Sequence, residues 1–266
     1  MARRRLRLSG RCSRRAYLGG SLALLGGALA SSSDSAWAFG EEGAFHPRVL
    51  LTGAARWQGL RTTAPARWSD EVVRRTSAPG RLRPATVHAD EAELLAEAFV
   101  VWGGAGEVAP LTSREIARLR QFFAMGGMLL VDDFDPGDGA FGRAARREIA
   151  RVLPDQAPVS IGPENVVFRS FYLLKRAVGR VLGPPKLDAV LRAGQVQVLF
   201  SSHDLLGALA RDPTGGPSLD VEPGGDRQRE EATRLAVNIA LYVLCSNYKD
   251  DQVHAEHIMR RRGGPR

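Results

Sequence analysis

The most constraining feature of this sequence is the stretch of residues 111–138, which reads LTSREIARLRQFFAMGGMLLVDDFDPGD. Thr112 stands three residues before Glu115, which is the spacing of a capping box, where a hydroxyl and a carboxylate each accept a backbone N–H. Apolar residues then recur at helical spacing, namely Ile116, Leu119, Phe122 and Phe123. The stretch therefore predicts a helix that begins after Thr112 and buries one face.

The same stretch continues into a buried strand. Gly126 and Gly127 end the predicted helix, because glycine adopts the left-handed conformation at little cost. We expect Gly127 to be required for the turn into the next strand if its φ is positive; with ordinary backbone angles there is no such requirement. The apolar run 128–131 follows at once, as expected of a strand covered on both faces, and ends at Asp132 and Asp133. A helix, a glycine turn and a buried strand with acids at its carboxyl end form a unit of an open α/β sheet.

Further apolar segments predict strands that alternate with helices, at residues 48–53, 85–88, 99–102 and 196–201. Such alternation predicts a parallel sheet with right-handed crossovers. About five strands in all favour a three-layer α/β fold, with the flavodoxin-like order 2-1-3-4-5 and helices on both faces. Ligands of such sheets bind beyond the carboxyl ends of the strands. A final helix is predicted over 230–245, after a long loop over 207–227.

The N-terminal segment, residues 1–38, has the features of a twin-arginine signal peptide. Arg14 and Arg15 precede a glycine-rich apolar segment, and residues 36–38 form an A-x-A cleavage site. We therefore expect export to the periplasm or cell envelope; the alternative is an uncleaved N-terminal anchor. The rest of the chain divides into a linker, one α/β domain and a basic C-terminal tail, at residues 39–47, 48–250 and 251–266.

The net charge limits the partners that are expected, and the cysteine content limits the disulfides. Removing the leader takes away seven arginines and one aspartate, which lowers the net charge from +8 to +2. This balance gives no reason to expect nucleic acid as a partner. The basic run 260–262 is the one place where contact with an anionic membrane or an acidic partner is expected; otherwise it is a solvated tail. Cys245 is the one cysteine outside the leader, so no internal disulfide forms.

Several short stretches match, in order, the motifs of one bacterial family. They are WxxEVxxRTS at 68–77, GG to DD at 126–133, FxRxxRRE at 141–148, FxSFY at 168–172, SxxDL at 201–205, and RE with N and Y at 229–242. With them the chain resembles the family called domain of unknown function 4159, over about residues 45–262. The resemblance implies a fold similar to class I glutamine amidotransferases, without an established activity. Members are often exported and encoded near ATPase and von Willebrand-type envelope proteins, which implies an envelope partner by analogy.

The nucleophile of the amidotransferases is missing from its expected place. Those enzymes need a cysteine on a sharp turn between a strand and a helix, beside backbone N–H donors. Here residues 103–106 follow the third predicted strand, Asp132 and Asp133 follow the fourth, and Cys245 lies in the final helix. This arrangement argues against amidotransferase activity.

Glycines and polar residues gather at the carboxyl ends of the predicted strands. The candidate ligand-binding residues are Gly53, Gly103, Gly104, Gly106, Asp132, Asp133 and Asp204. The glycines either let backbone N–H groups approach an anion or form a tight turn. The acids at 132, 133, 135 and 138 either hold a hard cation such as Ca²⁺ or cap a helix and form a turn. The sequence assigns no metal site with confidence, and the cofactor is unknown.

His203 is the candidate general base at this edge, with Asp132 as its partner, unless it is an ordinary loop histidine. Arg75, Arg229 and Glu230 either line the edge or form ion pairs that tie helices to loops. The distance between His203 and Asp132 separates the alternatives, because a catalytic pair must come within hydrogen-bond reach.

The leading hypothesis is an exported, non-catalytic module of the cell envelope that binds a small ligand or a protein. It rests on the predicted leader and on the missing nucleophile. The alternative is a hydrolase or metal-assisted enzyme that uses Asp132, Asp133 and His203 at the carboxyl edge of the sheet.

Overall fold

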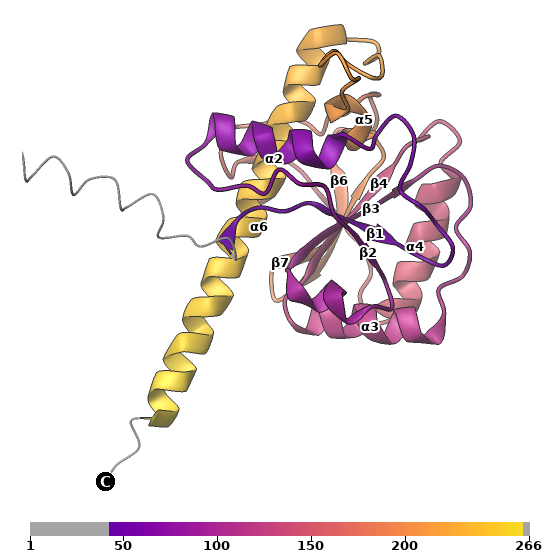
Figure 1. Ribbon diagram of the computed structural model, residues 1–266. Coiled ribbons are helices and arrows are strands. Elements are labelled where there is room, and N and C mark those ends of the chain that lie inside the picture. The colour runs from indigo at the N-terminus through magenta and orange to yellow at the C-terminus, as the bar shows by residue number, and fades with distance from the viewer. Residues whose placement is uncertain (1–42, 263–266) are drawn as a thin grey trace, which may run out of the picture. The chain divides into compact units, whose positions relative to one another are not determined.

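The computed structural model describes residues 43–262, with side chains to residue 246 (Figure 1). The predicted signal peptide, and the part of the predicted linker before residue 43, lie outside the described residues. Among the helices of residues 43–262, none is long and apolar enough to cross a membrane.

The fold is α/β, and its centre is a seven-stranded sheet in the order β2-β1-β3-β4-β7-β6-β5. The strands are β1 (Arg48–Leu51), β2 (Thr86–His88), β3 (Phe99–Gly104), β4 (Met128–Asp133), β5 (Val159–Ile161), β6 (Leu187–Arg192) and β7 (Gln195–Ser201). The pairs from β2 to β7 are parallel, whereas β6 pairs antiparallel with both β7 and β5. All the predicted strands are present, but their predicted number is wrong, because β6 and β5 extend the sheet beyond β7.

The two strands that the sequence did not predict carry weak local signals. β6 and β7 form a hairpin whose turn residues, Ala193 and Gly194, both have positive φ, at 49° and 81°. Such a turn normally favours Asn-Gly rather than Ala-Gly. β5 has 3 residues, of which Val159 and Ser160 are exposed. An unusual turn and a short edge strand leave little pattern in the sequence.

Helices pack on both faces of the sheet (Figure 1). They are α2 (Ala64–Arg75), α3 (Ser113–Ala124), α4 (Ala140–Val152), α5 (Leu205–Leu209) and α6 (Gly225–Arg262), with short 3₁₀ helices η3 (Ala92–Ala96) and η4 (Val166–Phe168). One core contains residues of α2, α5 and α6, and the other contains residues of α3 and α4. Successive residues of β4 face opposite cores: Leu130 belongs to the first and Leu129 to the second.

The unit of α3 and β4 forms as predicted, with one correction. Thr112 Oγ1 accepts from the Glu115 N–H, and Glu115 Oε2 accepts from the Thr112 N–H at 2.7 Å, so the capping box is confirmed. The residue with positive φ is Gly126, at 87°, and not Gly127. A Cβ at Gly127 would lie 2.5 Å from the ring of Phe122. Gly127 therefore does not have the positive φ that was one reason to expect a glycine there, and close packing against Phe122 explains its glycine instead.

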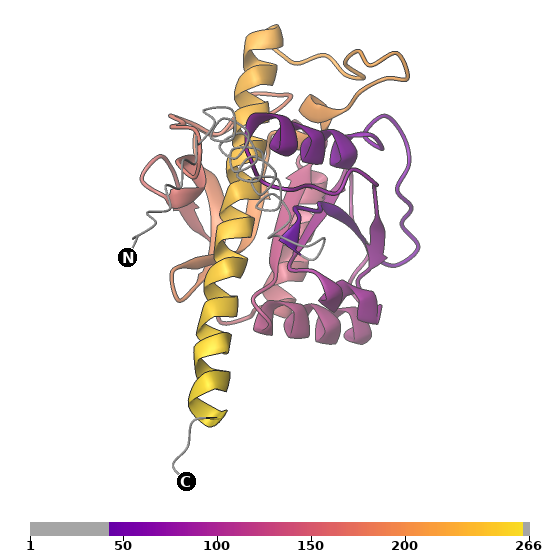
Figure 2. The ribbon, with the colours of Figure 1, turned by 60° about the vertical axis from the view of Figure 1, so that its left-hand side comes forward.

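The final helix is longer than predicted. α6 spans 38 residues and includes residues 251–262 of the predicted tail. Figures 1 and 2 show its C-terminal turns extending past the sheet. Hydrogen bonds fix its middle to the domain; for example, Trp68 Nε1 donates to the Ala236 carbonyl at 2.8 Å, and Tyr242 Oη accepts from the Val196 N–H at 2.8 Å.

Candidate functional site

Asp132, at the carboxyl end of β4, is fully buried and caps another element. Its two oxygens accept the N–H groups of Leu205 and Leu206 at 2.9 and 2.8 Å, so it holds the start of α5. Burial, and then the negative charge of Asp204, raise the pKa of Asp132 to about 7. Asp132 therefore joins β4 to the segment after β7.

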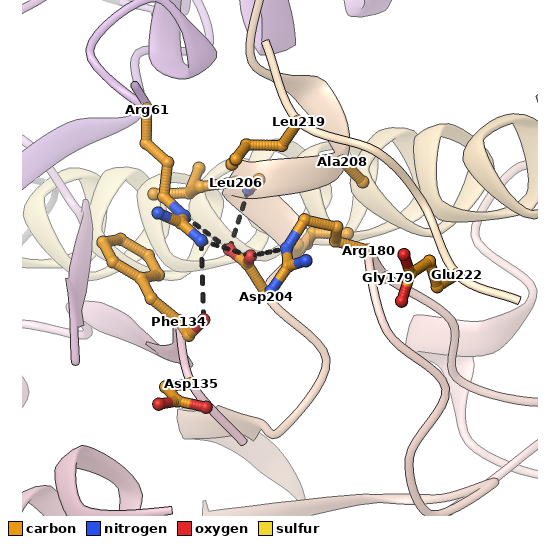
Figure 3. Close-up of polar contacts among 12 residues, drawn as sticks. Arg61, Phe134, Asp135, Gly179, Arg180, Asp204, Leu206, Ala208, Leu219 and Glu222 are labelled. Atoms are coloured by element: carbon orange, nitrogen blue, oxygen red, sulfur yellow. Dashed lines mark hydrogen bonds and ion pairs between the residues drawn. The ribbon is translucent and has the colours of Figure 1, made fainter. Parts of the chain in front are cut away.

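Asp204 is also fully buried, but it is paired with two arginines (Figure 3). Arg61 Nε donates to Asp204 Oδ1 at 2.7 Å, and Arg180 Nε donates to Oδ2. The Arg61 guanidinium also lies 4.4 Å from the centroid of the Phe134 ring. We call Asp132, Asp204, Arg61, Arg180 and Phe134 the Asp204 cluster. Buried charges need such partners, and here they come from separate loops.

Asp204 also adopts a strained conformation. Its φ is 52°, which few residues other than glycine adopt, and its side chain accepts from the Gly207 N–H at 2.9 Å. The Arg180 N–H donates to the carbonyl of Asp204 at 3.2 Å as well. Every one of these contacts is internal to the fold, so the cluster closes the carboxyl edge between β4 and β7.

His203 does not pair with Asp132. Its side chain is 1% exposed, and its Nε2 lies 2.9 Å from the Pro184 carbonyl, so Nε2 carries the proton and donates. Nδ1 has no hydrogen-bond partner among the described residues. Burial lowers the pKa of His203, which keeps the ring neutral at pH 7. No hydrogen bond joins His203 to Asp132 within residues 43–246, so the geometry gives no support to a catalytic pair.

Asp133 is a cap as well. It is buried, with Oδ1 accepting from the Asp135 N–H at 3.1 Å and Oδ2 from the Gly142 N–H at 3.0 Å. Burial raises the pKa of Asp133 above its usual range. No group of three or more His, Cys, Asp or Glu suited to a metal ion occurs among the described residues. These contacts favour the capping and turn alternative over a cation site.

The glycines of the carboxyl edge mostly make room for other groups. A Cβ at Gly103 would lie 2.4 Å from the Phe134 ring, and one at Gly104 would lie 2.7 Å from the Phe141 ring. The Gly53 N–H donates to Glu115 Oε1 at 2.8 Å. Gly106 has a φ of 79° and open space around it. Aromatic packing and turn geometry therefore explain these positions without a bound anion.

The charged residues of α2 and α6 form ion pairs that join the helices. The two Nη atoms of Arg75 donate to the two carboxylate oxygens of Glu230, each at 2.8 Å. Arg229 donates to the carbonyls of Ala208 and Leu219, each at 2.7 Å. The geometry supports the ion-pair alternative for Arg75 and Glu230 and a loop-fixing role for Arg229.

A different region presents apolar side chains to solvent. Val166, Phe171 and Leu173, which we call the apolar surface, are 54%, 47% and 87% exposed. They lie on η4 and the segment after it, and η4 itself is anchored by the fully buried Phe168. Three exposed apolar side chains within eight residues stand out against the polar edge described above.

A buried asparagine of α6 fixes the backbone beneath the apolar surface. Asn238 Oδ1 accepts from the N–H groups of Phe171 and Tyr172 at 3.2 and 2.7 Å, and its Nδ2 donates to the Tyr172 carbonyl at 2.8 Å. Arg234 lies 5.2 Å from the centroid of the Tyr172 ring. The segment is thus held in one conformation while its apolar side chains remain outside.

The family model described as domain of unknown function (DUF4159) matches residues 48–244, which is more than half of the 266-residue chain. The chain belongs to the DUF4159 family. No curated protein matches it. The Asp204 cluster and the apolar surface both lie within the DUF4159 domain.

Sequence reasoning found part of the arrangement in this DUF4159 domain. It identified Asp132 and Asp204 at the carboxyl edge but missed Arg61 and Arg180, because both lie in irregular segments without a pattern of their own. The apolar surface had a signal, since Phe171 belongs to the FxSFY motif at 168–172. Exposure of a side chain, however, is not visible in such a motif.

Proposed function

We propose that this protein is an exported, non-catalytic binding module of the cell envelope, with an amidotransferase-like fold, and that it docks a partner protein through the apolar surface. The observation that carries the proposal is the Asn238 clamp, which holds Phe171 and Tyr172 by three hydrogen bonds. An apolar segment fixed in place while exposed fits a docking surface, because preorganisation reduces the entropy lost on binding.

The carboxylates at the carboxyl edge already have partners within the fold, which supports a binding role over a catalytic one. Asp132 and Asp133 accept backbone N–H groups, and Asp204 is neutralised by two arginines. In the described part of the chain, these carboxylates are therefore already satisfied within the fold. A hydrolase needs a nucleophile or general base that can reach its substrate, and none of these groups is so placed.

Charges beside the apolar surface indicate the chemistry of the partner. Arg169 and Lys175 flank the surface and are exposed. Lys175 makes no hydrogen bond or ion pair with residues that the structure describes. Complementary charges guide association and orient the partner. The partner is accordingly a protein segment with apolar side chains that insert between Val166, Phe171 and Leu173 and with Asp or Glu beside them.

Site-specific crosslinking in the native host tests this proposal. A photo-reactive amino acid replaces Leu173 in one strain and Met125 in another; Met125 is 67% exposed and lies at the end of α3, outside the apolar surface. We expect position 173 alone to crosslink one partner, through a peptide with apolar residues flanked by Asp or Glu. Equal crosslinking from both positions, or no crosslink from 173, would refute the docking role.

A further inference from the structure

A cavity on the face of the sheet that α4 covers has the character of a ligand site. It has a volume of about 180 Å³ and is lined by Arg146, Ser160, Pro184, Lys186, Asp188, Phe200, Ser202 and His203. Its lining comes from α4, from β5, from the start of β6 and from the end of β7, where Asp188 pairs with Phe200. A cavity of this size has room for a small ligand and not only for a single water molecule.

We propose that this cavity binds a small oxyanion, a carboxylate or a phosphate, that also carries a neighbouring hydroxyl group. The inference deepens the proposed function and rests on it in one respect: the ligand is bound and is not converted. Two features of the lining carry it, namely its cations and its two hydroxyls.

The cations supply the attraction for an anion. Arg146 is held in place, with Nη2 2.9 Å from Asp188 Oδ2 and its guanidinium 4.4 Å from the centroid of the Phe200 ring. Lys186 makes no hydrogen bond or ion pair within residues 43–246. Its charge has only a through-space electrostatic interaction with the carboxylate of Glu164. Two cations and the single carboxylate of Asp188 leave one positive charge in excess. A fixed guanidinium beside an ammonium that has no ion pair of its own suits an oxyanion.

Two hydroxyls complete the lining. Ser160 and Ser202 both line the cavity, and neither side chain makes a hydrogen bond to another described residue. Each hydroxyl can donate to an oxyanion or accept from a ligand hydroxyl. The cavity thus offers cationic donors together with hydroxyls that can donate or accept, which match a hydroxylated oxyanion better than a neutral or purely apolar molecule.

Calorimetric titration of the full chain tests the inference. The probes are glycerol 3-phosphate and glycerate, which differ in the oxyanion, with glycerol as the uncharged comparison. We expect one or both anions to bind at a single site and glycerol not to bind; the preferred anion identifies the group recognised. Absence of binding by both anions at millimolar concentration, or equal binding of glycerol, would overturn the inference.

Two charge-deleting variants separate a built site from general attraction. Lys186→Ala removes a lining cation just before β6, whereas Arg192→Ala removes an exposed cation at the far end of β6. The first is expected to weaken binding at least about tenfold, and the second less than about twofold. Equal weakening by both would mean non-specific charge attraction and would overturn the inference.

The outcomes distinguish this inference from the proposed function. Conversion of a bound probe, detected as a new product by mass spectrometry, would refute a non-catalytic role and overturn the inference as stated. Failure of both anions to bind would leave crosslinking from position 173 unaffected.

Discussion

Asp132 and Asp204 lie in the same buried cluster, but their carboxylates have different partners. Asp204 has two guanidinium partners, whereas Asp132 has only backbone N–H groups and lies close to the charge of Asp204. Burial and that neighbouring charge raise the pKa of Asp132 to about 7. An unfolded aspartate has a pKa of about 3.9. The native protein therefore holds the Asp132 proton more tightly than the unfolded chain does.

This difference predicts how stability changes with pH. Between about pH 4 and pH 7 the native state binds the additional proton, so the contribution of Asp132 to stability falls as pH rises through this window. Asp132→Asn removes the ionisation, and the urea midpoint of the variant is expected to fall less than that of the wild type from pH 5 to pH 8. The lowered pKa of His203 acts in both proteins and cancels in the comparison. Parallel pH profiles for the two proteins would contradict the assignment.

Gly127 is a second position with a testable effect, because a Cβ atom there would collide with a neighbouring ring. Gly127→Ala places a methyl group 2.5 Å from the ring of Phe122, and overpacking of this kind costs about 1–3 kcal/mol. We expect urea unfolding to show that loss. Combined with Phe122→Leu, which removes the ring, the alanine should cost clearly less than it does alone. Strictly additive losses would show that Phe122 is not the obstacle.

At the scale of elements, local pattern decided what the sequence could predict. The unit of α3 and β4 was predictable, because its capping box, apolar spacing and glycines are all local signals. β6 and β5 were not, because the Ala193-Gly194 turn after β6 is an unusual one and β5 is a short, exposed edge strand. Long-range contacts could not be predicted from the sequence. Arg61 and Asp204, for example, are 143 positions apart, and only the folded chain brings them together.

The Asn238 clamp is an element-scale contact with a measurable effect. Asn238→Leu keeps the size of the side chain but leaves the Phe171 and Tyr172 N–H groups without their acceptor. Amide exchange in the peptide spanning 166–174 should become faster, and stability should fall by about 1–3 kcal/mol. Thr233→Val is the matched control, because the Thr233 hydroxyl bonds only to the Arg229 carbonyl of its own helix. Unchanged exchange in the first variant would mean that the segment is held by other contacts.

At the scale of the whole molecule, the two proposed binding regions lie on opposite faces of the sheet. The apolar surface belongs to the face covered by α2, α5 and α6, because Phe168 beneath it packs in that core. The small cavity belongs to the face covered by α4, because Phe200 packs in the other core. The Asp204 cluster lies at the edge between them and joins β4 and β7 to the surrounding loops.

Export is also a property of the whole chain. Arg14 and Arg15 are proposed to direct the folded protein through the twin-arginine route, with cleavage after Ala38. Sequencing the N-terminus of the protein from the periplasmic fraction of its host should give residue 39 as the first residue. A double Arg14→Lys, Arg15→Lys variant should accumulate unprocessed in the cytoplasm. A wild-type chain that keeps Met1 and stays in the cytoplasm would refute the export proposal.

The most direct test of the central claim is the dissociation constant of the crosslinked partner for variants of the apolar surface. Leu173→Ser and Phe171→Ser should each weaken binding at least about tenfold, because central apolar contacts carry most of the free energy of such interfaces. Met125→Ser, at a position elsewhere whose exposure of 67% lies between those of Phe171 and Leu173, should change it less than about twofold. All three proteins should unfold at the same urea concentration as the wild type. A partner that binds the Leu173→Ser and Phe171→Ser proteins as tightly as the wild type would contradict the account.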